Sequence, residues 1–181
     1  LITNEWKEQN GWIDIKDWQA IKKVNKDTTG LWFFNSGPLA GASQPHRHIQ
    51  LLRREKSELS CPREKWILDF SNLNYTNEKF CKNIIIKKFS KSLNEENIHE
   101  IYKELTNKLG LGNYKIDKKP KYPYNLIFTN NWMVLIKRKT DNIHGISINA
   151  LGFAGYILVT KSSDLTYLKK YGPEKLLEKL L

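Results

Sequence analysis

Residues 35–50 read NSGPLAGASQPHRHIQ, a run of small residues that leads into two histidines and a glutamine. Side chains of a β-strand alternate between its two faces. A strand over residues 44–53 therefore places four polar side chains in one row, and these are Gln44, His46, His48 and Gln50. The other face of the same strand would carry Arg47, Ile49 and Leu51. The pattern predicts that two imidazoles and a carboxamide share one side of an extended segment.

The loop before this strand is expected to bind an anion. Gly37 and Gly41 can adopt positive φ, so the backbone N–H groups between Ser36 and Ser43 could converge on phosphate oxygens. An ordinary turn between two strands would have a similar composition. Because this loop leads directly into the histidine segment, we favour the phosphate-binding interpretation.

Two neighbouring histidines allow more than one chemistry. A neutral imidazole is an effective nucleophile toward phosphorus when its second ring nitrogen is held by a fixed acceptor, and its attack gives a covalent phosphoramidate. A lone strand histidine is more often structural. Metal ligation is the third alternative, but the other histidines, His99 and His144, are remote in sequence and are expected on the solvated surface. We therefore expect a nucleophilic histidine and no metal site.

Outward from this stretch, the chain predicts an α+β fold with a mainly antiparallel sheet and flanking helices. Strands are expected at residues 31–35, 44–53, 82–89, 124–128 and 132–136, with further strand material at 146–148 and 155–160. Helices are expected at residues 14–26, from a capping box at 92–95 to Gly110, and at 165–170 and 174–180.

The composition describes a globular chain with a basic surface. Of 181 residues, 30 are Lys or Arg and 19 are Asp or Glu, which gives a formal net charge of +11. This charge favours polyanionic partners, although a bias toward lysine on solvated faces is the simpler explanation. A basic nucleic-acid-binding module is the alternative from another class, with Trp32 and Trp132 as exposed aromatics. No ribonucleoprotein motif or recognition-helix pattern supports it.

Cysteines and apolar runs bear on the cellular compartment. Cys61 and Cys81 form no CxxC pair, so reduced thiols are expected rather than a disulfide framework or a zinc site. No apolar run approaches the ~20 residues of a membrane span, and the start lacks a signal-peptide pattern. A cytoplasmic location is therefore expected. Residues 1–3 read as the middle of a strand without an initiator methionine, so we expect a fragment of a longer protein.

Residues 35–50 resemble the active-site signature of the ATP adenylyltransferases, also called diadenosine tetraphosphate phosphorylases, within the histidine-triad superfamily. A second match lies downstream, where residues 124–126, 131–133 and 145–155 (YNL, NWM and GISINALGFAG) are similar to the C-terminal region of that family. The resemblance implies a single histidine-triad-like catalytic domain over residues 1–181. Its core would span 1–115, and a family-specific region over 116–181 would complete the sheet.

The resemblance also implies a reversible reaction. His48 attacks an α-phosphate of diadenosine tetraphosphate, ATP leaves, and inorganic phosphate converts the adenylyl-histidine to ADP. By motif position His48 is the nucleophile, His46 positions it, and Gln50 contacts the phosphoryl oxygens. The residues expected to bind substrate along the phosphate path are Asn35, Ser36, Gly37, Gly41, Ala42, Ser43 and Gln44.

Gln50 bears on the type of reaction. Hydrolytic relatives of the family usually carry a third histidine at this position, and an amide can donate a hydrogen bond but cannot act as a general acid. A nucleotide phosphate is a weak base and leaves without that acid, so Gln50 favours nucleotidyl transfer over phosphoramidate hydrolysis. Hexose-1-phosphate uridylyltransferases share the His-x-His-x-Gln pattern, so adenylyl and uridylyl donors both remain open.

Three further residues and one ion complete the expected site. Ser147 and Asn149 alternate onto one strand face and would contact phosphate or adenosine, with Lys161 as a charge partner, although small residues at 147–155 equally allow close strand packing. Magnesium is expected to arrive with the polyphosphate, and no covalent cofactor is expected. Family members carry an upstream part that includes some of the base pocket and a phosphate-binding lysine, so this chain leaves base specificity open.

Overall fold

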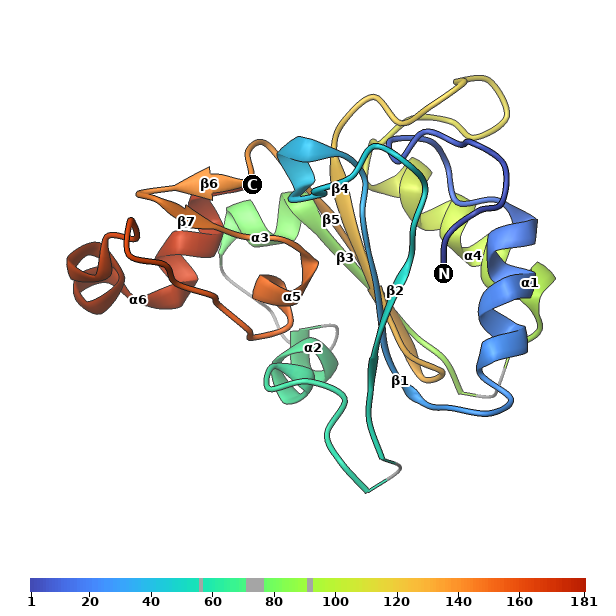
Figure 1. Ribbon diagram of the computed structural model, residues 1–181, viewed down its shortest axis with the longest axis horizontal. Helices are drawn as coiled ribbons and strands as arrows, with labels where there is room; N and C mark the ends of the chain where they lie inside the picture. Colours follow the sequence, from blue (N-terminus) through green and yellow to red (C-terminus); the bar gives the residue numbers. More distant parts are fainter. Residues whose placement is uncertain (56, 71–76, 91–92) are drawn as a thin grey trace.

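The computed structural model describes residues 1–55, 57–70, 77–90 and 93–181. They form a five-stranded sheet in the order β2-β1-β4-β5-β3, and every neighbouring pair is antiparallel. Helices pack on both sides of this sheet (Figure 1). The predicted α+β class with a mainly antiparallel sheet is therefore confirmed. The strands are β1 (Gly30–Asn35), β2 (Gln50–Arg53), β3 (Ile84–Lys88), β4 (Tyr124–Phe128) and β5 (Trp132–Lys137).

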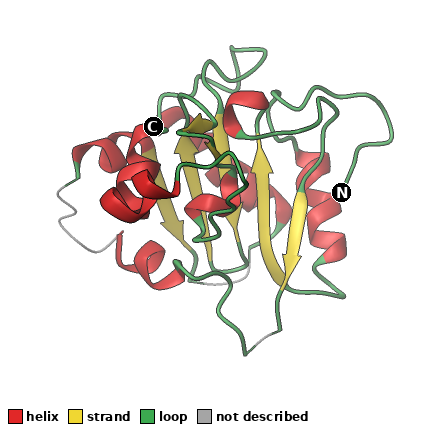
Figure 2. Cartoon of the chain, turned by 60° about the vertical axis from the view of Figure 1, so that its left-hand side comes forward, coloured by secondary structure: helices red, strands yellow, loops and turns green. Residues whose placement is uncertain are grey.

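Alternation along the strands divides the core into two clusters, one on each face of the sheet. Trp32 and Leu126 belong to the cluster that packs against α1 (Ile15–Val24) and α4 (Glu95–Lys108). Phe33 and Ile127 belong to the other cluster. Figure 2 shows the helices on the two sides of the sheet. That second cluster includes residues of α2 (Glu64–Phe70), α3 (Glu78–Asn83), α5 (Ala150–Phe153) and α6 (Leu165–Lys179).

Side-chain caps fix where the two helices on the first face begin. Asp14 accepts hydrogen bonds from the backbone N–H groups of Lys16 and Asp17, and the Asp17 carboxylate accepts one from the backbone N–H of Asp14. This reciprocal capping box starts α1. Asn94 starts α4 by accepting from the backbone N–H of Asn97. Each such cap stabilises its helix by about 1 kcal/mol.

Two predicted strands are shorter than expected. The strand predicted at 82–89 begins at Ile84, because the preceding residues form α3, which Asn77 caps. The strand predicted at 44–53 is regular only in β2. Before β2 the two histidines make isolated antiparallel bridges to residues of the N-terminal segment. The histidine segment is extended, as predicted, but its partner on one side is a loop rather than a strand.

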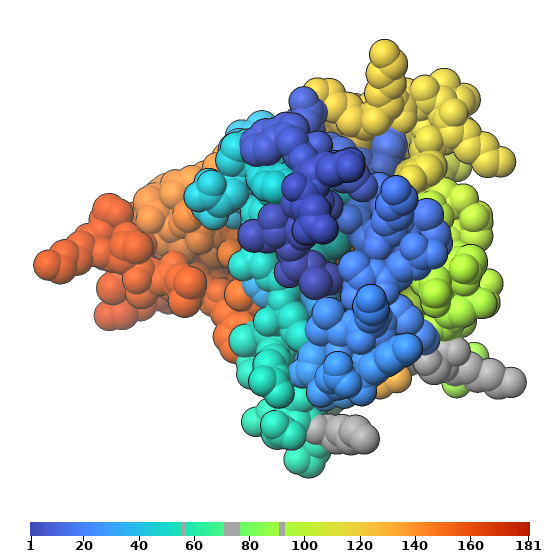
Figure 3. All heavy atoms as spheres, turned by 45° about the vertical axis from the view of Figure 1, so that its right-hand side comes forward, coloured from blue at the N-terminus to red at the C-terminus, as the bar shows by residue number. Residues whose placement is uncertain are grey.

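The C-terminal part departs further from the prediction. Residues 146–148 do not join the main sheet, because β7 (Ile146–Ser147) pairs with β6 (Asn142–Ile143) in a separate two-stranded sheet. Residues 155–160 form no strand, so that prediction is wrong. The two predicted C-terminal helices are the halves of α6, which Gly172 interrupts with φ 77° and ψ 169°. These elements form the lobe that projects to one side in Figure 3.

Three side chains predicted at the surface are buried. Trp32 and Trp132 are 2% and 0% exposed, so the nucleic-acid alternative loses its two aromatic platforms. His99 on α4 is 8% exposed and packs edge-on against Tyr114, with ring centroids 5.1 Å apart. Burial lowers the pKa of His99, and the nearby Lys103 adds to that shift. Ser92, at which the predicted capping box over residues 92–95 begins, lies outside the described residues.

The cysteines and the helices bear on the predicted compartment. Cys61 and Cys81 are not joined by a disulfide. Within the ranges that the structure describes, no helix is both long and apolar enough to cross a membrane.

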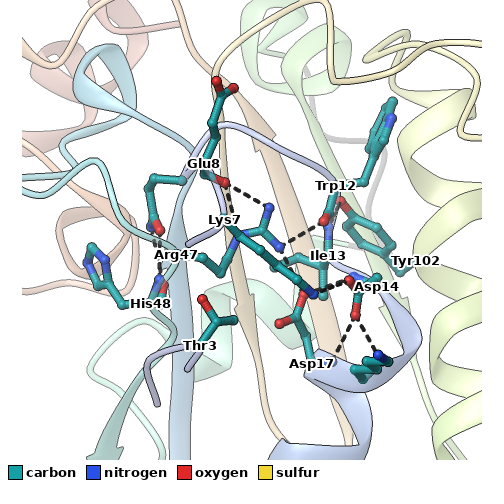
Figure 4. Close-up of polar contacts among 12 residues, drawn as sticks. Thr3, Lys7, Glu8, Trp12, Ile13, Asp14, Asp17, Arg47, His48 and Tyr102 are labelled. Carbon is teal, nitrogen blue, oxygen red and sulfur yellow. Dashed lines mark hydrogen bonds and ion pairs between the residues drawn. The ribbon is translucent and has the colours of Figure 1, made fainter. Parts of the chain in front are cut away.

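The histidine segment is anchored by its opposite face. The side chain of Arg47 turns toward α1 and away from His48, as Figure 4 shows. Its guanidinium pairs with the Asp17 carboxylate at 2.9 Å and donates to the backbone carbonyls of Glu8 and Trp12. Both charged side chains are almost fully buried. Burial raises the pKa of the Asp17 carboxyl, and the Arg47 charge opposes that shift.

Asp17→Asn tests this anchor. The substitution keeps the shape of the side chain but leaves the Arg47 charge buried without a counter-charge, which costs about 3–5 kcal/mol of stability. Urea unfolding followed by tryptophan fluorescence should show the loss. Glu104→Gln, which removes an exposed carboxylate on α4, should leave the unfolding midpoint unchanged. A loss below about 1 kcal/mol for Asp17→Asn would mean that the pair contributes no more than a surface ion pair.

Candidate active site

The ring of His48 is held by one nitrogen and open at the other. Nδ1 lies 2.9 Å from the backbone carbonyl oxygen of His46. A carbonyl oxygen can only accept, so Nδ1 carries the proton and Nε2 keeps its lone pair. Nε2 makes no hydrogen bond to the described residues and is not among the buried polar atoms that lack a partner, so it reaches the surface. This is the tautomer that a nucleophilic imidazole requires.

The ring of His46 contacts the N-terminal segment rather than the ring of His48. Its Nε2 lies 3.0 Å from Thr3 Oγ1 and 3.2 Å from the backbone oxygen of Glu5. The same ring stacks on Trp6, with centroids 4.9 Å apart and planes inclined by 24°. His46 therefore orients His48 through its main-chain carbonyl, while its imidazole fastens the N-terminal segment over the site.

Gln9 is a functional candidate that no sequence pattern indicates. It is 2% exposed, and its amide Nε2 donates to the backbone oxygens of Asn35 and His48, at 2.7 and 3.2 Å. Its Oε1 accepts from the backbone N–H of His48 at 2.8 Å. One side chain thus makes the contacts that a neighbouring strand would make, and it fixes the backbone of His48.

Strand register brings the two sequence matches together. β1 pairs with β2 as far as Phe33 and Gln50, and beyond this pair the Gln9 side chain bridges the backbones of Asn35 and His48. Asn35 also pairs directly with Asn125 of β4. Residues opposite one another in antiparallel strands share a face of the sheet. Asn35 and Asn125 therefore share the face that α5 covers, and Gln9 joins the backbone of His48 to this polar row.

Asn35 is the central residue of this row. It is 3% exposed, and its Oδ1 accepts from Nδ2 of Asn125 at 2.8 Å and from the backbone N–H of Ala150 at 2.9 Å. The neighbouring Ser36 is also buried, and its hydroxyl accepts from the backbone N–H of Tyr124. Both predicted substrate-binding residues thus connect segments of the site instead of lining its surface.

The glycine loop has the predicted backbone shape but uses its donors internally. Gly37 has φ 111° and Gly41 has φ 84°, on either side of the short 3₁₀ helix η1 (Pro38–Ala40). The backbone N–H groups of four loop residues donate to carbonyls within the same loop. These residues are Gly37, Ala40, Gly41 and Ala42. The prediction that these four N–H groups point at a phosphate is therefore wrong, because they form the hydrogen bonds of the tight turn.

The free donors of the loop lie at its end. Ser43 and Gln44 are exposed, and neither of their backbone N–H groups has a partner among the described residues. Gln50 is exposed on β2, on the same side as His48. The donors available to an anion are therefore those next to the two histidines.

Residues of the second sequence match, at 145–155, pack against the glycine loop. A Cβ added to Gly41 would lie 2.7 Å from the Cβ of Asn149, so only glycine allows this approach. Asn149 caps α5 through the backbone N–H of Leu151. Ser147 is exposed, and its hydroxyl lies 3.4 Å from Asp141. Lys161 is exposed in a turn, and no contact joins it to the loop in the described part of the chain.

Arg138 supports this arrangement from behind. It is 2% exposed, and it donates to Oδ1 of Asn125 and to the backbone oxygens of Thr140 and Ile148. Asn125 in turn donates to the backbone oxygen of Ala40 in the loop. Burial lowers the pKa of Arg138 to about 10. Sequence reasoning missed this residue because a basic residue after a strand looks solvated.

Cavities and clusters elsewhere do not compete with this site. A cavity of about 470 Å³ between the N-terminal segment and α1 is lined by Arg47 and Ile49 but by neither histidine. Among the described residues, no three His, Cys, Asp or Glu side chains gather as a metal site would require.

A carbonyl-oriented histidine beside a glycine loop, on a mainly antiparallel sheet, defines the class of histidine-triad-like proteins. The chain belongs to the ATP adenylyltransferase family, because residues 61–181 match the model of the ATP adenylyltransferase C-terminal domain. Residues 1–67 match the Ap4A phosphorylase N-terminal domain, where Ap4A is diadenosine tetraphosphate.

Individual relatives agree with this assignment. Protein APA1 of Saccharomyces cerevisiae is 24% identical in an alignment 187 residues long, and this alignment covers 91% of this chain and 58% of that protein. Crystal structures of yeast Ap4A phosphorylase Apa2 in complex with AMP and with Ap4A match all of this chain, with TM-scores of 0.71 and 0.69 and identities of 22% and 21%. The chain spans 65% and 66% of those two structures. The fold is therefore similar to that of Apa2, over less than two thirds of the length of Apa2.

Gln9→Met tests how the nucleophile is held. Methionine keeps the approximate volume but removes three hydrogen bonds, and we expect a loss of about 1–3 kcal/mol. The amide of His48 should then exchange with solvent faster, as measured by hydrogen–deuterium exchange. Gln44→Met, at an exposed position, should change neither quantity. Unaltered protection of the His48 amide in Gln9→Met would contradict the role of Gln9.

Proposed function

We propose that this chain carries the nucleophile of an enzyme that cleaves diadenosine tetraphosphate with inorganic phosphate to ATP and ADP, reversibly. Membership of the ATP adenylyltransferase family supports the reaction class. The observation that carries the proposal is the ring of His48, with Nδ1 held by a carbonyl and Nε2 open. The structures of Apa2 with AMP and with Ap4A support nucleotides as the ligands.

In the first step Nε2 of His48 attacks an α-phosphorus. The N–P bond forms as the bond between that phosphorus and the bridging oxygen breaks, so ATP leaves with the electron pair. Positive charge develops on the imidazole, and the His46 carbonyl stabilises it through the Nδ1 hydrogen bond. The product is adenylyl-His48.

In the second step an oxygen of inorganic phosphate attacks the adenylyl phosphorus from the side that ATP has left. The N–P bond breaks, its electron pair returns to Nε2, and ADP is released. Phosphate and ATP are both weakly basic leaving groups, so the same site can run the reaction in either direction.

Gln50 fits this chemistry because it supplies a donor without a transferable proton. Its carboxamide can bind a phosphoryl oxygen as negative charge accumulates there. Ser43 and Gln44 are proposed to bind the following phosphates through their backbone N–H groups. Asn149 is proposed to meet the nucleotide at the rim of the loop, with Ser147 and Lys161 contacting it from the lobe.

Magnesium is proposed to enter with the polyphosphate rather than in a protein cage. The absence of a disulfide between the two cysteines is compatible with the proposed cytoplasmic location.

Alanine substitutions at the two histidines test the mechanism. His48→Ala should lower kcat/KM for Ap4A phosphorolysis about 10⁴-fold or more, because the covalent route is lost. His46→Ala keeps the orienting carbonyl and should lower it by about tenfold or less. Both kcat/KM values are measured with the full-length protein, by following the release of ATP and ADP from Ap4A and phosphate by chromatography.

A radiolabelled adenylyl group bound to protein is the second readout. It should accumulate with wild type when phosphate is omitted and should not form with His48→Ala. Unchanged turnover in His48→Ala would reject the mechanism. Turnover of a UDP-hexose without adenylyl transfer would assign the site to a uridylyltransferase instead.

Gln50→His tests the choice between transfer and hydrolysis. An imidazole at this position can protonate an amine leaving group, so hydrolysis of adenosine 5′-phosphoramidate should rise relative to Ap4A cleavage by about tenfold or more. Gln50→Asn, which cannot donate a proton, is the matched control and should not show this rise. An equal ratio in both variants would contradict the proposed role of the amide.

A further inference from the structure

Arg138 is a buried cation without a counter-charge among the described residues. Its Nη atoms donate to Asn125, Thr140 and Ile148, and all three acceptors are neutral oxygens. Its Nε is buried and has no hydrogen-bond partner. In the described ranges, no carboxylate oxygen lies within 4.0 Å of the Arg138 guanidinium, the distance that defines an ion pair. The cation is therefore solvated by dipoles alone.

The contrast with Arg47 shows that this is a property of the position. Arg47 is equally buried, but the Asp17 carboxylate lies 2.9 Å away and neutralises it. The charge of Asp141 opposes the lowering of the Arg138 pKa by burial, but the two side chains form no ion pair. Burying an unpaired charge is costly, and the uncancelled positive potential that it produces favours an anionic ligand nearby.

The position of Arg138 indicates which ligand that is. Asn125, to which it donates, donates in turn to the backbone oxygen of Ala40 in the glycine loop. The backbone oxygen of Ile148, which Arg138 also binds, lies against Gly41. The guanidinium thus lies directly behind the loop that leads to His48.

We infer that Arg138 provides the positive potential that draws a polyphosphate chain to the end of the glycine loop, beside His48. It acts through the loop as a positioning residue and does not itself touch the substrate. The attraction between Arg138 and an anion grows with the number of negative charges on the ligand. Salt screens this attraction only weakly, because the Arg138 charge is buried. The inference rests on the proposed function for the identity of the anion, a nucleoside polyphosphate.

Binding of inorganic tripolyphosphate tests the inference without chemistry. Calorimetry on the full-length protein would use His48→Ala as the background for every variant, at fixed ionic strength. Arg138→Gln should weaken binding about tenfold or more, and Arg138→Lys, which keeps the charge but loses the fork, by about threefold or less. Lys87→Gln removes one exposed charge on β3 and should leave the affinity unchanged.

Two results would overturn the inference. If Arg138→Gln and Arg138→Lys weaken tripolyphosphate equally, the residue only holds the loop in shape. If Arg138→Gln also weakens monophosphate by the same factor, the charge of the ligand is irrelevant. Neither result depends on turnover, so failure of the proposed function, seen as absence of adenylyl transfer with wild type, remains distinguishable.

Asp141→Asn keeps the test decisive if Arg138→Gln does not fold. Removing the carboxylate that opposes Arg138 should tighten tripolyphosphate binding about two- to fivefold. Glu104→Gln removes one exposed carboxylate on α4 and should leave binding unchanged. Equal affinities for Asp141→Asn and Glu104→Gln would refute the inference.

Discussion

The site depends on the alternation of side chains along residues 46–50. On one face of this segment Arg47 and Ile49 are buried, and Arg47 is tied to α1 by its ion pair with Asp17. The other face must therefore carry His48 and Gln50 outward. A shift of one residue would bury both and expose the charge of Arg47, so the ion pair protects the register as well as the stability. The nucleophile is thus placed by the residues beside it in sequence, which never touch substrate.

Cross-strand pairing explains why the two matched segments, far apart in sequence, make a single site. Asn35 is the last residue of β1, and its Oδ1 accepts hydrogen bonds both from Asn125 of β4 and from the first N–H of α5. Asn149 then lies against Gly41, where no side chain could be accommodated. The loop, the nucleophile strand and the C-terminal segment are therefore joined by side-chain amides. Amides suit this purpose because each offers a donor and an acceptor without bringing a charge.

The sequence predicted what local pattern controls. Strands β1, β4 and β5, helices α1 and α4 and the alternation at the histidines follow from periodicity and caps. It failed where a long-range partner decides. Residues 155–160 have the local pattern of a strand, but they pair with no strand of the main sheet. The loop N–H groups were expected to be free, but the tight 3₁₀ turn uses them. Gln9 and Arg138 were missed because burial alone makes them significant.

The backbone carbonyl that orients the ring of His48 has a chemical consequence that an imidazole in the same place would not have. The carbonyl of His46 cannot take up a proton, so the Nδ1 proton stays on His48 while Nε2 bonds to phosphorus. In the proposed mechanism the adenylyl-imidazole is then cationic at nitrogen, and its N–P bond is a good target for a second phosphate. A partner able to accept the proton would leave a neutral and more stable adduct. The fixed dipole therefore keeps the intermediate reactive in both directions, which a reversible transferase needs and a simple hydrolase does not.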